Sequence, residues 1–209
     1  MSNKFLGLLM VPMVMGSIGM ANAELTPVSA SQTFNATLAE MMEIEANDAG
    51  ASLIADINPE DGQLSTALKS SFNVTTNIKD AKVYLSAEVA SDSSTESALF
   101  KKAGHSFIVL GNVGDEQKPT VDAINDCKNA TSTPENNANA IAYQFASVDR
   151  PNTVDISYDH DKDVIIYELH EDSATVGITT KTAAAEGTFS RKDTAGSYQA
   201  QVTLSSANL

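Results

Sequence analysis

The chain has 209 residues, which is enough for one domain with a substantial hydrophobic core. Its 27 acidic residues outnumber its 13 lysines and arginines, so the formal net charge is -14 at pH 7. Such a charge repels phosphate backbones and anionic headgroups, and we therefore expect no nucleic-acid partner. The single cysteine excludes an intramolecular disulfide and a thiolate-rich zinc cluster. Nothing in this composition indicates a cofactor enzyme.

Residues 1–23 have the layout of a secretory signal peptide. Lys4 supplies the positive charge, residues 5–20 form an apolar run, and Ala-Asn-Ala at residues 21–23 is a small-residue cleavage site. A retained membrane helix is the weaker alternative, because proline and glycines interrupt the run and no basic cluster follows it. We expect export, a mature chain that begins at Glu24, and no membrane insertion after cleavage.

The mature chain has an apolar period of two, which predicts β-strands. Alternating runs rich in Val, Ile, Thr, Phe and Tyr are separated by polar, Gly or Pro clusters, and they lie at residues 53–57, 72–78, 83–87, 107–110, 141–145, 154–158, 164–169, 176–178 and 198–204. Helical spacing occurs at residues 121–128, before a polar stretch that is predicted to be a loop. So many short strands predict an all-β fold, an immunoglobulin-like β-sandwich rather than a parallel sheet with crossover helices.

The beginning of the mature chain also alternates like a strand. Apolar side chains fall on one face, at Val28, Ala30, Phe34, Ala36 and Leu38. A second apolar stretch at residues 41–46 could itself be the first strand of the sandwich. One interpretation is a single long, bent first strand. The other is that residues 24–38 form an extension that a neighbouring molecule takes up.

The end of the chain raises the complementary question. Gly196 opens the last alternating run, and too little sequence follows Leu204 for another strand. A sandwich that lacks the strand covering its last one would expose a groove into its core and a row of unpaired backbone groups. A strand added from outside would fill both deficits.

Both ends resemble subunits of chaperone-usher pili. Residues 194–204, Thr-Ala-Gly-Ser-Tyr-Gln-Ala-Gln-Val-Thr-Leu, are similar to the last pilin strand, with its Ala-Gly-x-Tyr-x-x-x-Val pattern. Residues 34–50 and 72–85 are similar in layout to the alpha-class, or colonisation-factor, pilins, which also lack a disulfide. The chain departs from the commonest pilins in having Asn208 where they have an aromatic residue in the penultimate position.

The resemblance implies a major pilus subunit rather than an enzyme. Such pilins are immunoglobulin-like folds that lack their last strand. A periplasmic chaperone lends a strand to each subunit. At the outer-membrane usher, the N-terminal extension of the next identical or related subunit replaces the chaperone's strand. Carried over to this chain, residues 1–23 are the signal peptide, residues 24–38 the donor-strand extension and residues 39–209 the incomplete domain. The donor residues would be Val28, Ala30, Phe34, Ala36 and Leu38, and the acceptor edge would be Gly196, Tyr198, Ala200, Val202 and Leu204.

The implied location is a fimbria on the surface of a Gram-negative bacterium, with a role in adhesion or biofilm. An alternative from a different class is a self-sufficient secreted β-sandwich that binds a ligand or a carbohydrate through its loops. An enzyme is a third and less supported hypothesis.

The polar clusters elsewhere in the sequence do not predict a metal site. The alternating aspartates of residues 159–163 have calcium-loop spacing, but Val164 stands where a glycine is needed and His170 where a bidentate carboxylate is needed. A solvated hairpin turn is the preferred interpretation. His160 and His170 could meet across this hairpin, but exposed polar histidines are the simpler reading of the pattern.

The candidate nucleophiles also lack the sequence motifs in which catalytic nucleophiles occur. His105 and Ser106 do not lie in a Gly-x-Ser-x-Gly motif, and Cys127 has no Cys-x-x-Cys partner, so it is predicted to be inert or oxidised between molecules. We therefore expect no catalytic residue, no metal and no cofactor.

Overall fold

The computed structural model describes residues 30–89, 97–102, 105–113, 140–147, 153–182, 189 and 193–207. Within these ranges the chain is all-β, with a single short 3-10 turn at Asp48–Gly50. The strands are β1 (Met42–Ala46), β2 (Lys69–Thr76), β3 (Ala81–Val89), β4 (Leu99–Lys102), β5 (His105–Asn112), β6 (Ala140–Ser147), β7 (Val154–Asp159), β8 (Val164–Leu169), β9 (Ser173–Thr180) and β10 (Tyr198–Ser205).

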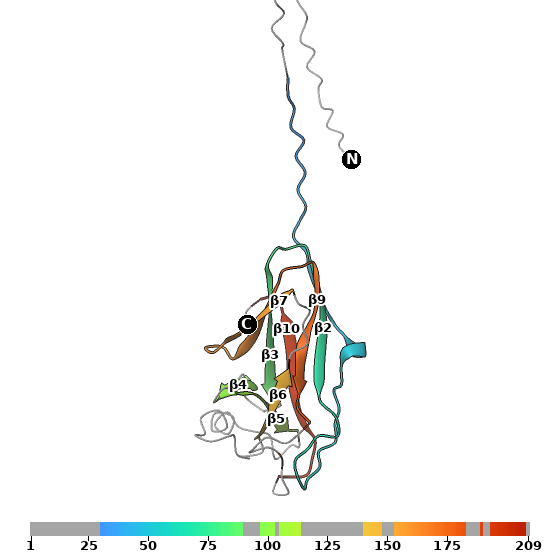
Figure 1. Cartoon of the computed structure of the whole chain (residues 1–209), viewed down its shortest axis with the longest axis vertical. Coiled ribbons are helices and arrows are strands. Elements are labelled where there is room, and N and C mark those ends of the chain that lie inside the picture. Colours follow the sequence, from blue (N-terminus) through green and yellow to red (C-terminus); the bar gives the residue numbers. More distant parts are fainter. Residues whose placement is uncertain are drawn as a thin grey trace, which may run out of the picture. The chain divides into compact units, whose positions relative to one another are not determined.

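The strands form two antiparallel sheets (Figure 1). One contains β1, β2, β9 and β6, and the other contains β10, β3, β8 and β7. Strand β5 pairs with β6 and with the first residues of β10, and β4 pairs with β5. The all-β prediction is confirmed, and two antiparallel sheets are the arrangement of a β-sandwich.

The hydrophobic core takes side chains from both sheets. Strand β3 buries every second residue, namely Ala81, Val83, Leu85, Ala87 and Val89. Val74 of β2 and Val176 of β9 belong to the same buried cluster. Because successive side chains of a strand point to opposite faces, the period of two in the sequence becomes one buried and one solvated face.

The predicted strand at residues 53–57 is wrong. This segment makes only isolated bridges, between Ser52 and Lys69 and between Ile57 and Leu64. Leu53 is 69% exposed and Ile54 is 86% exposed, and only Ala55 and Ile57 pack against the core, without a paired strand. Each of the other predicted runs overlaps a strand, and residues 41–46 correspond to β1.

Several predictions fall outside the described residues. These are the signal peptide, the helical spacing at residues 121–128, the polar loop that follows it, and Cys127. In the part of the chain that is described, no helix is long and apolar enough to cross a lipid bilayer.

Candidate functional site

Strand β10 has one edge that is largely unpaired. From Ala200 to Ser205 it pairs with β3 on one side. On its other side, the described strands pair with it only at Tyr198 and Gln199, through β5. The backbone groups that residues 200–205 present on this second side therefore have no strand partner in the described part of the chain. An edge of this kind is a template for an added strand.

A cavity of about 110 Å³ lies beside this unpaired edge. Its walls include Val202 of β10, Leu110 of β5 and Ile178 of β9, together with polar residues such as Lys69 and Thr180, so it draws on both sheets. An apolar cavity of about 150 Å³ holds a benzene ring, so this one is close to the size of a single aromatic side chain. We call β10's unpaired edge together with this cavity the acceptor groove.

The predicted acceptor residues are distributed as follows. Tyr198, Ala200 and Val202 line the cavity, whereas Leu204 is 8% exposed and belongs to the core. Gly196 does not open the strand as the sequence predicted, since β10 begins at Tyr198. Gly196 lies against the side chain of Asn112, where a Cβ atom would be 3.0 Å from the amide nitrogen, and the chain bends before pairing begins.

Tyr198 is fixed at one end of the groove. Its hydroxyl donates a hydrogen bond of 2.8 Å to the carbonyl of Thr194. Its ring meets the ring of Phe189 edge-on, with centroids 5.0 Å apart. Burial raises the pKa of the Tyr198 phenol above its ordinary value.

The predicted donor residues that are described all lie in residues 30–38. None of these residues belongs to a strand, and every one of them is exposed. Phe34 is 96% exposed and Leu38 is 86% exposed, whereas Val28 lies outside the described ranges. The chain divides into two units between Leu38 and Ala39, and β1 begins only at Met42. A single long first strand is therefore not observed over residues 30–46.

The sandwich begins at the end of β2 that is remote from the cavity. Asn77, which directly follows β2, donates through Nδ2 to the carbonyl of Ala39 at 2.8 Å and accepts from the amide of Met41 at 2.7 Å. Lys69, the first residue of β2, lines the cavity instead. The strand has 8 residues and spans about 26 Å, so these two features lie at opposite ends of the sandwich.

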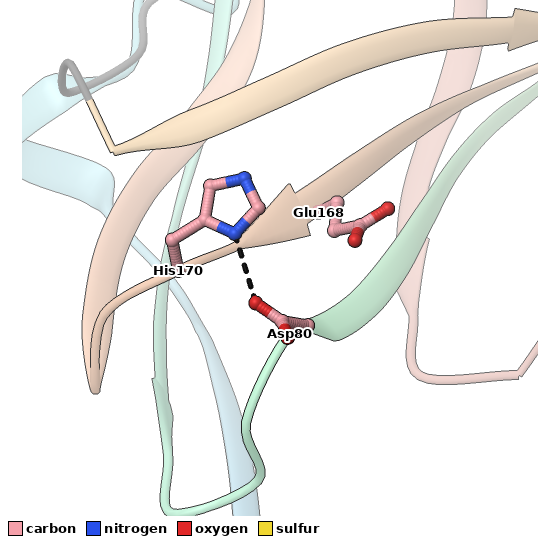
Figure 2. Close-up of side chains that lie close together, drawn as sticks. All are labelled: Asp80, Glu168 and His170. Carbon is pink, nitrogen blue, oxygen red and sulfur yellow. Dashed lines mark hydrogen bonds and ion pairs between the residues drawn. The ribbon is translucent and has the colours of Figure 1, made fainter.

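Asp80, in the turn that follows β2, lies in a charged cluster with Glu168 and His170 (Figure 2). Nδ1 of His170 lies 3.0 Å from Oδ1 of Asp80, and Glu168 forms an ion pair with Lys82 at 3.1 Å. Asp80, Glu168 and His170 present one ligand atom each within 4.8 Å of one another. Because each of these atoms already faces a partner of its own, we assign no metal to the cluster.

The hairpin between β7 and β8 is a turn, as the sequence predicted. Oδ1 of Asp159 accepts hydrogen bonds from the amides of Asp161 and Lys162, at 2.9 and 3.3 Å. The carboxylate of Asp163 accepts from the hydroxyl of Tyr158 at 2.6 Å. Burial and this hydrogen bond raise the pKa of Tyr158. The carboxylates of Asp159 and Asp163 therefore already accept hydrogen bonds within the hairpin.

The two histidines of this hairpin do not meet. His160 lies in the turn, with its ring edge-on to Tyr158 at 4.9 Å. His170 follows the opposite end of the hairpin, where Val154 pairs with Leu169. The sequence did not indicate the position of Asn77 beside Met41, nor that Leu110 and Ile178 would share a cavity with β10. These contacts join segments that are remote in sequence, and no local pattern encodes them.

Comparisons of this chain with protein-family models, with curated proteins and with solved structures return no match.

Proposed function

We propose that this chain is a structural subunit of a surface fimbria, an incomplete immunoglobulin-like pilin that polymerises by donor-strand exchange. One observation carries the proposal. The unpaired edge of β10 borders a cavity with apolar side chains such as Leu110, Ile178 and Val202 in its walls, and the same chain holds residues 30–38 exposed and outside any strand. The acceptor groove can pair with an added strand, and residues 30–38 are not engaged in a sheet, so the two features are complementary.

The alternation of residues 24–38 suits this groove. A strand that bonds to the edge of residues 200–205 would direct alternate side chains toward the core. Phe34, on the apolar face of the segment, has an aromatic ring that suits a cavity of about 110 Å³. Burial of Phe34 and Leu38 at about 1.5–3 kcal/mol each, with three smaller side chains and a ladder of backbone hydrogen bonds, gives on the order of 10 kcal/mol before ordering costs. A junction of this strength would stabilise a domain that has no disulfide.

Strand direction favours a second copy over the chain's own extension. Strand β10 runs toward the end of the sandwich where Asn77 holds Met41, because Ser205 pairs with Tyr84 while Ala200 pairs with Val89. An extension that folded back from Ala39 would have to run parallel to β10. All described pairings in this fold are antiparallel, and the extension of another molecule can meet that requirement.

Such joining would produce a filament. The sandwich begins at one end of β2 and the cavity lies at the other, so the extension is attached to the sandwich at the end remote from the cavity. A head-to-tail contact of this kind builds an open filament when the rotation between subunits does not close a ring. In this proposal the signal peptide directs export, a periplasmic chaperone covers the groove, and an outer-membrane usher exchanges the chaperone strand for the next subunit at the surface of a Gram-negative cell.

Deletion of residues 24–37 tests the proposal. We expect the truncated mature chain to be unable to polymerise, and its thermal unfolding temperature to rise when a synthetic peptide of residues 24–38 is added. A truncated chain that is a stable monomer with no response to the peptide would refute assembly and favour the self-sufficient, ligand-binding sandwich.

A matched pair of substitutions tests which face of the donor is buried. Phe34→Asp places a charge on the apolar face and should abolish polymers while chaperone binding persists. Thr33→Asp places the same charge on the opposite face and should leave polymers intact. Fibres that persist in Phe34→Asp would show that the assigned face is wrong.

A further inference from the structure

Both ring nitrogens of His170 face carboxylates. Nδ1 lies 3.0 Å from Oδ1 of Asp80, and Nε2 lies 3.0 Å from Oδ2 of Asp155. Asp80 belongs to the turn between β2 and β3, Asp155 belongs to β7, and His170 directly follows β8. The close-up in Figure 2 shows the imidazole turned toward Asp80. The side chain of His170 therefore bridges the β2–β3 turn and strand β7.

This geometry favours the doubly protonated ring. A neutral imidazole has one nitrogen that donates and one that accepts, so one of its lone pairs would face a carboxylate oxygen. Only the doubly protonated imidazolium donates to both carboxylates at once. The hydrogen bond to Asp80 and then the one to Asp155 raise the pKa of His170, and the hydrogen bond from His170 lowers the pKa of Asp80.

The other charged groups around His170 do not oppose a protonated ring. Glu168 on β8 is paired with Lys82 on β3 at 3.1 Å, so these two largely neutralise each other. Lys79 lies in the same turn as Asp80 and acts on its carboxylate. Glu171 and Asp172 follow His170 in the chain and are exposed. The surroundings are acidic on balance and favour a cation at His170.

The turn that His170 contacts also holds the start of the sandwich. Asp80 has a φ of 51°, in the left-handed region, and ends the turn that begins at Asn77. Asn77 binds the backbone of Ala39 and Met41. On the other side of the ring, the amide of His170 donates to the carbonyl of Thr153 at 3.0 Å, next to edge strand β7.

We propose that protonated His170 is a clasp that ties the β2–β3 turn to edge strand β7, so that acidity tightens the turn that anchors the base of the N-terminal extension and alkalinity releases it. The clasp does not depend on the function proposed above. Its effect on assembly does, because the extension is the proposed donor.

Exchange of the imidazole C2 hydrogen, followed by mass spectrometry over a range of pH, tests the clasp in the mature chain, whether monomeric or polymeric. We expect His170 to titrate at a higher pH in the folded chain than in the urea-unfolded chain, where its contacts with the two carboxylates are lost. Asp80→Asn and Asp155→Asn should each lower the His170 midpoint in the folded chain, whereas Asp161→Asn, in the β7–β8 turn, should leave it unchanged. Equal His170 midpoints in the folded and unfolded chains would overturn the clasp.

Backbone hydrogen exchange tests the link to the turn. In His170→Gln, residues 76–81 should exchange faster than in the native chain at about pH 5.5, and at the same rate in alkaline solution once the native ring has lost its proton. Equal rates at both pH values would overturn the link. Neither readout requires polymer formation, so a failed clasp and a failed assembly proposal remain distinguishable.

Discussion

The amide of Met41 donates a hydrogen bond of 2.7 Å to Oδ1 of Asn77, and the amide of Asn77 donates one of 3.1 Å to the carbonyl of Met41. The hydroxyl of Thr76 donates to the same carbonyl at 2.9 Å. Residues 30–38 have no such bonds within the described structure. A short cluster of polar contacts thus marks where the ordered sandwich starts.

Replacement of Asn77 by alanine should weaken the junction between subunits. The substitution removes the side-chain bonds to Met41 and Ala39, each worth about 0.5–1.5 kcal/mol, while the backbone pairing of β1 with β2 remains. We expect polymers that dissociate at a lower temperature, measured by heating and gel electrophoresis. Thr75→Ala, on the exposed face of β2, is the matched control; an equal loss in both variants would contradict a specific role for Asn77.

A charge in the acceptor groove should block strand uptake. Val202 lines the cavity and is half-buried, so Val202→Glu would place a carboxylate where the proposed donor strand would put an apolar side chain. We expect the truncated chain that carries this substitution to lose binding of a fluorescent peptide of residues 24–38. Thr203→Glu, on the exposed face of β10, should bind the peptide normally. Normal peptide binding by Val202→Glu would show that the donor strand does not occupy this cavity.

The strands could be predicted where one face of a strand is buried. The alternation of β3 is visible in the sequence because every second side chain enters the core. Strand β4 was missed because Leu99 and Phe100, which are neighbours, are both buried and leave no period of two. Residues 53–57 were wrongly predicted for the opposite reason, since Leu53 and Ile54 are both exposed.

The candidate site could be predicted only in part. The sequence indicated the side chains of β10, but not its neighbours, because Val202 pairs with Ala87 and shares a cavity with Ile178 through contacts that span most of the domain. The same holds for His170, whose partner Asp80 is 90 residues away along the chain. Periodicity identifies strands and their faces, whereas the pairing of distant strands depends on the packing of the whole sandwich.

Loss of the Tyr167 hydroxyl should destabilise the sandwich. The hydroxyl donates a bond of 2.7 Å to the carbonyl of Gly177, which joins β8 in one sheet to β9 in the other. Tyr167 is 0% exposed, so Tyr167→Phe leaves a buried carbonyl without this donor, at a cost of about 1–3 kcal/mol. Urea unfolding of the peptide-complemented chain measures the change. An unaltered free energy of unfolding would contradict the importance of this bond.

Gly177 should tolerate no side chain. A Cβ atom there would lie 1.9 Å from the carbonyl oxygen of Ser70 on the paired strand β2, so the two strands would have to separate. Gly177→Ala should cost at least about 1–3 kcal/mol in unfolding free energy, as overpacked cores do. Gly196→Ala is the matched comparison, because its Cβ would meet only the side chain of Asn112, at 3.0 Å. Equal losses in the two variants would count against the steric explanation.

Stability should depend on pH through His170 with a defined sign. Its pKa is raised above the ordinary 6.5 by Asp80 and then Asp155, so the folded chain holds the proton more tightly than the unfolded chain does. The resulting stabilisation is complete below pH 6.5 and is lost as the pH rises through the raised pKa. The pKa of Asp80 is lowered below its ordinary 3.8 by His170, so its contribution is complete above pH 3.8 and is lost as the pH falls through the lowered pKa. The unfolding temperature of the native chain should therefore exceed that of His170→Gln most between these two values and should converge with it in alkaline solution. A difference that stays constant across this range would mean that the proton on His170 does not stabilise the fold.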